Sequence, residues 1–135
     1  MPRFASPRFL RAVLAADAAS CIATGAAQVF ATAALAQLLN LPAALLAGTG
    51  WFLVGYAAVV AFAATRDPVP RAMVWLFVAG NVAWATACAV LLASGAVRPT
   101  PLGVAWVIAQ AATVLVLADL QWVGLRGRRG LTRPA

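Results

Sequence analysis

The sequence of 135 residues contains no histidine, no lysine and no glutamate, and only three aspartates. Because histidine is absent, a histidine-ligated haem, a histidine-dependent catalytic triad and the usual zinc sites are excluded. The two cysteines, Cys21 and Cys88, lie inside apolar runs without a Cys-x-x-Cys or paired acidic pattern, which indicates buried free thiols rather than metal or redox chemistry. We therefore expect a protein that is not an enzyme and holds no cofactor.

Charged residues are also scarce, at 10% of the chain, whereas hydrophobic residues make up 64%. Soluble proteins contain roughly 25% charged residues, so water is not the main solvent of this chain. The net charge of +7 comes from arginine, and the arginines stand at the ends of apolar runs rather than along a face with aromatic residues. This placement is typical of membrane proteins and argues against a nucleic-acid partner.

Four apolar stretches are present, at residues 10–39, 43–65, 71–95 and 101–125, and a basic tail follows at 126–135. A membrane-spanning helix needs about 20 mainly apolar residues. The stretches are separated by "NLP" at 40–42, "RDPVPR" at 66–71 and "SGAVRPTP" at 94–101, which contain proline and other residues typical of turns. Such short connections favour antiparallel neighbours. The sequence thus predicts one all-α domain over residues 1–135, an integral membrane four-helix bundle.

Arginine is distributed unevenly between the two predicted sides of the membrane. Nine arginines fall on the side of the two chain ends and the second connection: Arg3, Arg8, Arg11, Arg66, Arg71, Arg126, Arg128, Arg129 and Arg133. Arg98 alone falls on the other side. Cytoplasmic loops carry the excess of positive charge, so we expect both termini in the cytoplasm.

Small residues recur at a spacing of four in three of the predicted helices. These residues are Ala15, Ala19, Ala23, Ala27 and Ala31 in the first, Ala79, Ala83 and Ala87 in the third, and Ala105, Ala109 and Thr113 in the fourth. In lipid, helices associate through close packing over small side chains. The stripes predict a tight bundle, and Gly48, Gly55 and Gly80 are expected as further points of close approach.

Four polar residues lie in the predicted cytoplasmic half of four different helices: Asp17, Tyr56, Asn81 and Asp119. We expect them to form one intramembrane polar cluster. Gln28 and Gln110 lie farther from the cytoplasm and are expected in a second, outer polar layer. Asn81 and Trp84 stand three residues apart and share a helix face. They are either a helix-helix hydrogen bond beside an aromatic filler, or the wall of a small pocket for a lipid, quinone or pigment.

Each intramembrane aspartate has three interpretations, because a carboxylate within a membrane costs free energy unless it finds a partner. It is an interfacial group paired with an arginine such as Arg11 or Arg126, a structural hydrogen-bonded tie, or a group that binds a proton or substrate. The pattern alone does not choose among them.

Several segments carry a family resemblance, above all "DAASCIATG", "GNVAWATACAVLLASG" and "PTPLGVAWVIAQAATVLVLADLQWVGLR". They resemble a recurrent type of small four-span bacterial inner-membrane protein without an assigned activity. The resemblance implies a multi-pass protein of the bacterial inner (cytoplasmic) membrane. It carries no functional residue over to this chain.

Two functions from different classes remain. The first is a non-catalytic membrane protein that packs against a partner, itself or membrane lipids, in an assembly or accessory role. The alternative is a small proton-coupled transporter or channel that uses Asp17 and Asp119. An intramembrane aspartyl enzyme is disfavoured because no glycine-flanked aspartate motif is present.

Overall fold

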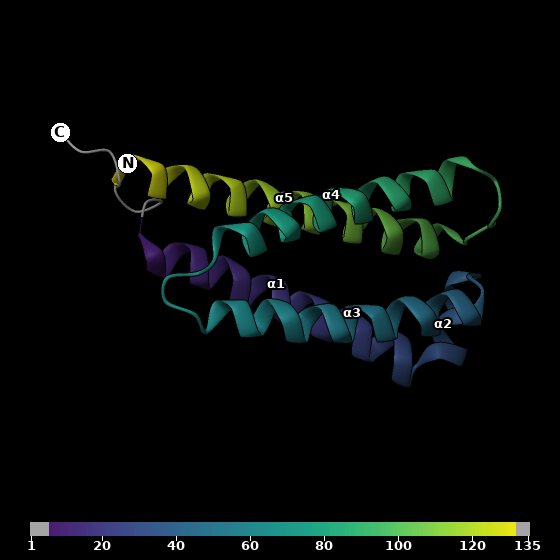
Figure 1. Ribbon diagram of the computed structural model, residues 1–135. Helices are drawn as coiled ribbons and strands as arrows, with labels where there is room; N and C mark the ends of the chain where they lie inside the picture. Colours follow the sequence, from purple (N-terminus) through teal and green to yellow (C-terminus); the bar gives the residue numbers. More distant parts are fainter. Residues whose placement is uncertain (1–5, 132–135) are drawn as a thin grey trace.

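The computed structural model describes the backbone of residues 6–131 and the side chains of residues 6–129, and this part of the chain forms α-helices joined by short connections (Figure 1). The helices are α1 (Pro7–Phe30), α2 (Thr32–Leu39), α3 (Ala43–Ala64), α4 (Arg71–Ala93) and α5 (Pro101–Leu131). All but α2 are long and apolar enough to cross a membrane. The prediction of an all-α chain with four long apolar helices is confirmed.

The first apolar stretch, predicted as one helix over residues 10–39, is broken at Ala31. Ala31 has φ −115° and ψ 29°, outside the helical region, and α2 leaves the line of α1 from this point (Figure 1). The hydroxyl of Thr32 donates to the carbonyl oxygens of Val29, at 2.9 Å, and Gln28. Hydroxyl bonds back to the preceding turn often bend helices, and this pair of bonds lies directly after the break.

The other helix ends agree with the turn residues, with one exception. Asn40 ends α2 in the left-handed conformation, with φ 51°, and α3 begins directly after Pro42. The exception is α5, which begins at Pro101 as predicted but runs to Leu131 instead of ending near residue 125. The first part of the predicted basic tail is therefore helical. Arg128 and Arg129 lie in the last turn of α5, where they complement the helix dipole.

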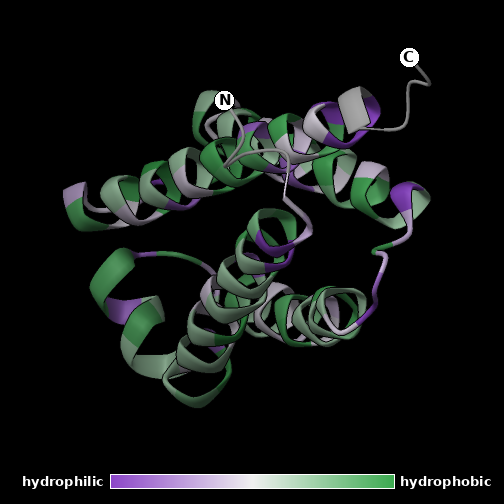
Figure 2. Ribbon diagram, turned by 90° about the vertical axis from the view of Figure 1, so that its left-hand side faces the viewer, coloured by the Kyte–Doolittle hydropathy of each residue, from purple (hydrophilic) through white to green (hydrophobic). Residues whose placement is uncertain are grey.

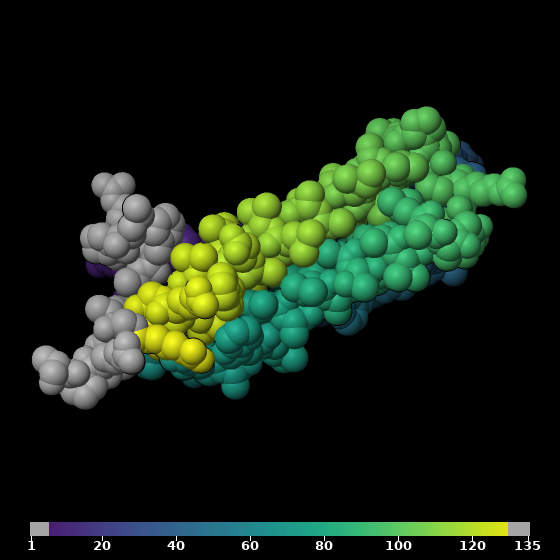
Figure 3. All heavy atoms as spheres, turned by 90° about the horizontal axis from the view of Figure 1, so that it is seen from above, coloured from purple at the N-terminus to yellow at the C-terminus, as the bar shows by residue number. Residues whose placement is uncertain are grey.

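The long helices associate as two pairs, α1 with α3 and α4 with α5. The view in Figure 3 shows α4 and α5 side by side along their length. In the first pair the backbones approach closely at Gly25 and Gly50, because a Cβ added to Gly50 would lie 3.1 Å from the Gly25 carbonyl oxygen. The prediction was wrong for Gly48 and Gly55, which face open space, and held for Gly80, which packs against the Tyr56 ring.

One end of the molecule brings together the start of α1, the α3–α4 connection and the end of α5 (Figure 1). The Arg11 Nε donates to the Ala64 carbonyl oxygen at 3.0 Å, and the Arg128 Nη1 donates to the Val69 carbonyl oxygen at 2.8 Å. We call this the arginine end, because every described arginine except Arg98 belongs to these segments.

The opposite end, the α2 end, joins α2 to the α4–α5 connection. The Asn40 side-chain amide donates to the Arg98 carbonyl oxygen at 2.6 Å. Thr100 donates to Leu38 and Leu39 carbonyl oxygens through its hydroxyl at 2.9 Å and its backbone N–H at 3.0 Å. These bonds connect the two helix pairs at the end of the molecule opposite the arginine end.

The lateral surface of the molecule is largely apolar, and Figure 2 shows that hydrophobic residues predominate along the long helices. Large side chains are exposed on it, among them Trp51 at 62%, Leu76 at 63% and Val116 at 59%. A surface with this many exposed apolar side chains is unlike that of a soluble monomer. The surface is compatible with a multi-pass membrane protein.

Candidate functional site

A fully buried carboxylate, Asp17 of α1, joins the two helix pairs near the middle of the bundle. Asp17 is 0% exposed, and its Oδ2 accepts from the Gln121 Nε2 of α5 at 2.6 Å and from the Asn81 Nδ2 of α4 at 3.1 Å. Its Oδ1 faces the Cys21 Sγ at 3.5 Å. Asn81 also donates to the Gln121 Oε1 at 3.4 Å. Three helices are therefore tied through one carboxyl group by neutral donors.

The predicted polar cluster is correct for Asp17 and Asn81 and wrong for Asp119. Asp119 is exposed on the outer face of α5, and Gln121, which is 0% exposed, occupies the inner face. Residues two apart on a helix do not face the same way, so only one of this pair reaches the interior. The signal for Gln121 was its spacing of four from Leu117 and Leu125, which are both buried.

Tyr56, the fourth member of the predicted cluster, lies beside it rather than in it. Its hydroxyl donates to the Phe77 carbonyl oxygen at 3.4 Å, and its ring meets the Phe77 ring edge-on at 5.8 Å. It also lines a small cavity of about 40 Å³ together with Cys21 and Asn81. Tyr56 thus covers one side of the buried carboxyl group.

The arginine partners considered for the aspartates are engaged elsewhere. Arg11 donates to a backbone carbonyl of α3, and the Arg126 guanidinium lies over the Trp122 ring, 3.9 Å from its centroid. The contacts of Asp17 match the second of the three interpretations, a structural hydrogen-bonded tie between helices.

Gln28 and Gln110, the two residues of the predicted outer layer, line the same cavity. Gln28 is 2% exposed, and its Oε1 accepts from the Thr49 hydroxyl at 2.8 Å, which ties α1 to α3. Gln110 is half-buried on α5. The two glutamines belong to opposite helix pairs, so the cavity between them separates the pairs.

Two cavities lie between the helix pairs, on the α2 side of the Asp17 cluster. The first, of about 350 Å³, is bounded by Ser20, Cys21 and Thr24 of α1 and by residues of α5. The second, of about 280 Å³, is bounded mainly by leucines of α3 and by α4. Trp84, Trp106 and Gln110 line both cavities. The two spaces are therefore neighbours that meet at these three side chains.

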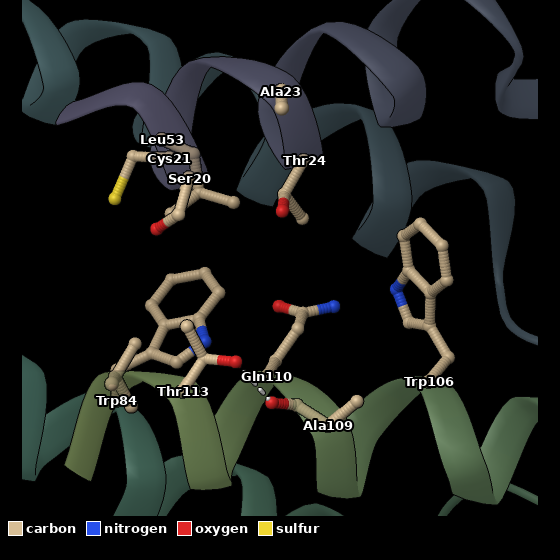
Figure 4. Close-up of a pocket in the computed structure, with 11 residues that line it drawn as sticks. Ser20, Cys21, Ala23, Thr24, Leu53, Trp84, Trp106, Ala109, Gln110 and Thr113 are labelled. Atoms are coloured by element: carbon tan, nitrogen blue, oxygen red, sulfur yellow. Dashed lines mark hydrogen bonds between the residues drawn. The ribbon is translucent and has the colours of Figure 1, made fainter. Parts of the chain in front are cut away.

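Figure 4 shows the first cavity from the side, with Ser20 and Thr24 on one wall and Trp84, Gln110 and Trp106 projecting from the other. The predicted pocket at Trp84 is confirmed in part. Trp84 borders all three cavities, and its ring stacks on the Phe52 ring with centroids 5.9 Å apart. Asn81 borders the small cavity and belongs to the Asp17 cluster instead.

The indole of Trp106 forms part of the wall of both cavities. Among the described residues, the Trp106 Nε1 is the one buried side-chain nitrogen or oxygen atom that has no hydrogen-bond partner. Leaving a buried donor unpaired costs about 1–3 kcal/mol. In Figure 4 this nitrogen is turned toward the side-chain amide of Gln110. No pattern in the sequence distinguishes it from the other tryptophans.

The small-residue stripes do not close the bundle, so that part of the prediction was wrong. In each of the three stripes most members are exposed, and these members include Ala15, Ala19, Ala23, Ala79, Ala83, Ala87, Ala105, Ala109 and Thr113. The interior is filled by larger apolar residues such as Leu14, Val60 and Phe77.

The topology arginines cluster at the arginine end as far as the structure describes them. Arg8, Arg11, Arg66, Arg71, Arg126, Arg128 and Arg129 belong to its three segments. Arg3 and Arg133 lie outside the described residues.

Comparison of the chain with protein-family models, curated protein sequences and solved structures gave no match. The arguments about function therefore rest on the residues and their geometry.

Proposed function

We propose that the chain is a non-catalytic protein of the bacterial inner membrane that acts by packing its helices against another membrane helix, in an assembly or accessory role. In this proposal α1, α3, α4 and α5 cross the membrane with antiparallel neighbours. The apolar lateral surface and the lengths of these helices support it.

The arginine end is the cytoplasmic side in this proposal, with both termini there. Support comes from the clustering of arginines at that end, since positive residues are retained on the cytoplasmic side. Arg126 and Arg129 are exposed there, and each arginine near an anionic lipid surface contributes about 1 kcal/mol of attraction. Membrane lipids are thus the first partner of the arginine end.

The main support for helix packing comes from the exposed small-residue stripes. Ala15, Ala19 and Ala23 on α1 and Ala105 and Ala109 on α5 are exposed, and Ala23 and Ala109 line the same cavity between these helices. The two stripes therefore border one groove on one side of the molecule. Small side chains let a further helix approach closely, which drives association in lipid. A stripe that the bundle itself leaves uncovered is available to a second copy or another protein.

Proton-coupled transport receives less support, because it was expected to use two carboxylates. Asp119 faces outward, and Asp17 is enclosed by three side chains from its own bundle. The enclosed carboxyl group ties helices together, which serves packing directly.

Substitution of the stripes tests the proposal. Ala19→Leu and Ala105→Leu each place a bulky side chain in one of the two stripes, at positions that line neither cavity. Ala61→Leu, on the exposed face of α3, is the matched control. Sedimentation equilibrium in mild detergent micelles and photobleaching counts in liposomes report the association state. We expect the unaltered protein to associate, the two stripe variants to do so at least about tenfold more weakly (about 1.4 kcal/mol), and the control to be unchanged.

Two results would contradict the proposal. One is a protein that stays monomeric in both detergent and liposomes and carries no co-purifying membrane protein. The other is an equal effect of all three leucine substitutions, which would show that the stripes play no special part.

A further inference from the structure

We propose that the two cavities between the helix pairs form a binding site for a lipophilic molecule that carries a carbonyl group, and that Trp106 and Gln110 hold this carbonyl. The inference concerns the space inside the bundle and does not depend on association through the stripes. It starts from one observation: two hydrogen-bond donors face each other in a mostly apolar space (Figure 4).

The space has the size and the access that a membrane molecule needs. Ligand pockets measure about 300–1,000 Å³, and the two adjoining cavities have volumes of about 350 and 280 Å³. The first cavity reaches the surface at Ala109 and Thr113 on one side, and the second reaches it at Ala87 on the other. These positions lie within helices of membrane-spanning length. Both openings therefore face lipid, and the occupant arrives from the bilayer.

The lining of the two cavities has an apolar part and a polar part. Leu41, Leu45, Leu46, Leu91 and Val107 line the second cavity, which suits an alkyl or isoprenoid chain. At 1.5 Å per residue, Trp106 lies about 7.5 Å and Gln110 about 13.5 Å along α5 from its start at Pro101. The polar groups are thus inside the apolar layer rather than at its aqueous edge, where a charged headgroup would remain. The part of the ligand that reaches them is uncharged.

The hydrogen-bonding groups specify a ligand acceptor. The Trp106 Nε1 is a donor only, it is buried, and it lacks a partner in the described structure. The amide nitrogen of Gln110 is also a donor, and Figure 4 shows it directed at the same indole. A carbonyl oxygen has two lone pairs and accepts from both groups at once. Gln110 is half-buried on a flexible stem, so its amide can shift to admit that oxygen.

Two classes of membrane molecule supply an uncharged carbonyl on a long apolar chain. One is the acyl ester of a bilayer lipid, and the other is a lipid-soluble quinone. The aromatic face of Trp84, which borders both cavities, suits the ring of a quinone as well as an acyl chain. The shared chemistry is the carbonyl acceptor, and the experiment separates the two sources.

The test follows the indole N–H of Trp106 by NMR. Full-length protein labelled with ¹⁵N at the tryptophan indoles is placed in nanodiscs of a dialkyl ether phosphatidylcholine, which has no acyl carbonyl. One arm titrates decylubiquinone into these nanodiscs, and the other replaces the lipid with dioleoylphosphatidylcholine. We expect the Trp106 proton resonance to move downfield, saturably with decylubiquinone or on replacement of the lipid. The shift should be larger than that of the outward-facing Trp51, which meets bulk lipid in both arms. The arm that responds identifies the source of the carbonyl.

Matched variants assign the effect to the proposed pair. Trp106→Phe removes the responding resonance, with Trp51→Phe as the control. Gln110→Leu is expected to weaken decylubiquinone binding, or the ester-dependent shift, by about tenfold because one of two donors is lost. Gln37→Leu, an exposed change on α2, leaves it unaltered.

Three outcomes would overturn the inference, and each is visible in the unaltered protein or against a control. The first is a Trp106 resonance that moves in neither arm. The second is a resonance already at its hydrogen-bonded position in ether lipid without quinone, which would show that Gln110 itself is the acceptor. The third is an effect of Gln110→Leu no larger than that of Gln37→Leu.

Discussion

The replacement Gln121→Leu is predicted to destabilise the folded bundle by about 1–2 kcal/mol. Gln121 is fully buried and donates the shorter of the two amide hydrogen bonds to the Asp17 carboxyl group, at 2.6 Å. It also accepts a longer bond from Asn81 at 3.4 Å. Leucine is similar in volume but has neither a donor nor an acceptor, so the change removes the tie between α1 and α5 without creating a large cavity.

The magnitude follows from what each bond is worth in a membrane. Interhelical hydrogen bonds there contribute about 0.6 kcal/mol on average and up to about 1.7, and the bond from Gln121 to Asp17 is short enough to belong to the upper part of that range. The bond from Asn81 is long and adds less. Asp17 still accepts from Asn81 at 3.1 Å, so its carboxyl group is not orphaned. The larger penalties expected for an unpaired buried charge therefore do not apply.

The assay is reversible unfolding in mixed micelles of dodecyl maltoside and SDS, followed by helical circular dichroism. Gln37→Leu is the matched control because it makes the same chemical change at an exposed position of α2, and its effect is expected within about 0.5 kcal/mol of zero. A double-mutant cycle with Asp17→Leu measures the coupling directly. Once Asp17 is leucine, Gln121→Leu should cost about 1 kcal/mol less than in the unaltered protein.

Equal free energies of unfolding for Gln121→Leu and Gln37→Leu would refute the reasoning. So would additive effects in the cycle, since additivity would mean that Asp17 and Gln121 do not stabilise one another.

Three further predictions test other parts of the structure. Asp119→Asn should change the free energy of unfolding by less than about 0.5 kcal/mol in the same micelle assay, because its side chain is exposed. Gly50→Ala should destabilise the fold by about 1–3 kcal/mol, because the added methyl group overpacks against α1. Gly48→Ala should stabilise the fold by about 0.5–1 kcal/mol, because the added methyl group meets open space. Equal thermal midpoints for the two variants would contradict both expectations. The orientation can be tested with single-cysteine variants made in a background without the two native cysteines. A membrane-impermeant maleimide should label Ser94→Cys on intact cells but label Thr65→Cys only after the membrane is opened. The reverse pattern would contradict the proposed orientation.

Much of the fold is readable from local sequence, because the bilayer-length rule and turn residues act over short distances. The starts of α3, α4 and α5 at residues 43, 71 and 101 lie at or directly after the prolines of the three connections. The clustering of arginines at one end follows from the same segments. The break at Ala31 is the exception, because no proline or glycine marks it in the sequence.

The candidate site was only partly predictable, and the pair Asp119 and Gln121 shows why. Depth along a helix is a property of residue number, so the layer that contains Asp17 and Asn81 was correct. The direction in which a side chain points depends on how its helix is rotated. The prediction chose Asp119 because it is charged, but the neutral Gln121 is the residue that reaches the interior. The alanine stripes failed for the same reason, because spacing identifies a face but not what the face contacts.

By itself, then, the sequence determined that four apolar helices span a membrane-sized length and that their arginines gather at one end, since both depend on composition along the chain. Only the tertiary structure decided which side chains meet across the bundle: Asp17 with Asn81 and Gln121, and Trp106 with Gln110 over an apolar space. Such contacts depend on how each helix rotates against neighbours from the other helix pair. That rotation is set by the packing of all the helices together, which no single segment encodes.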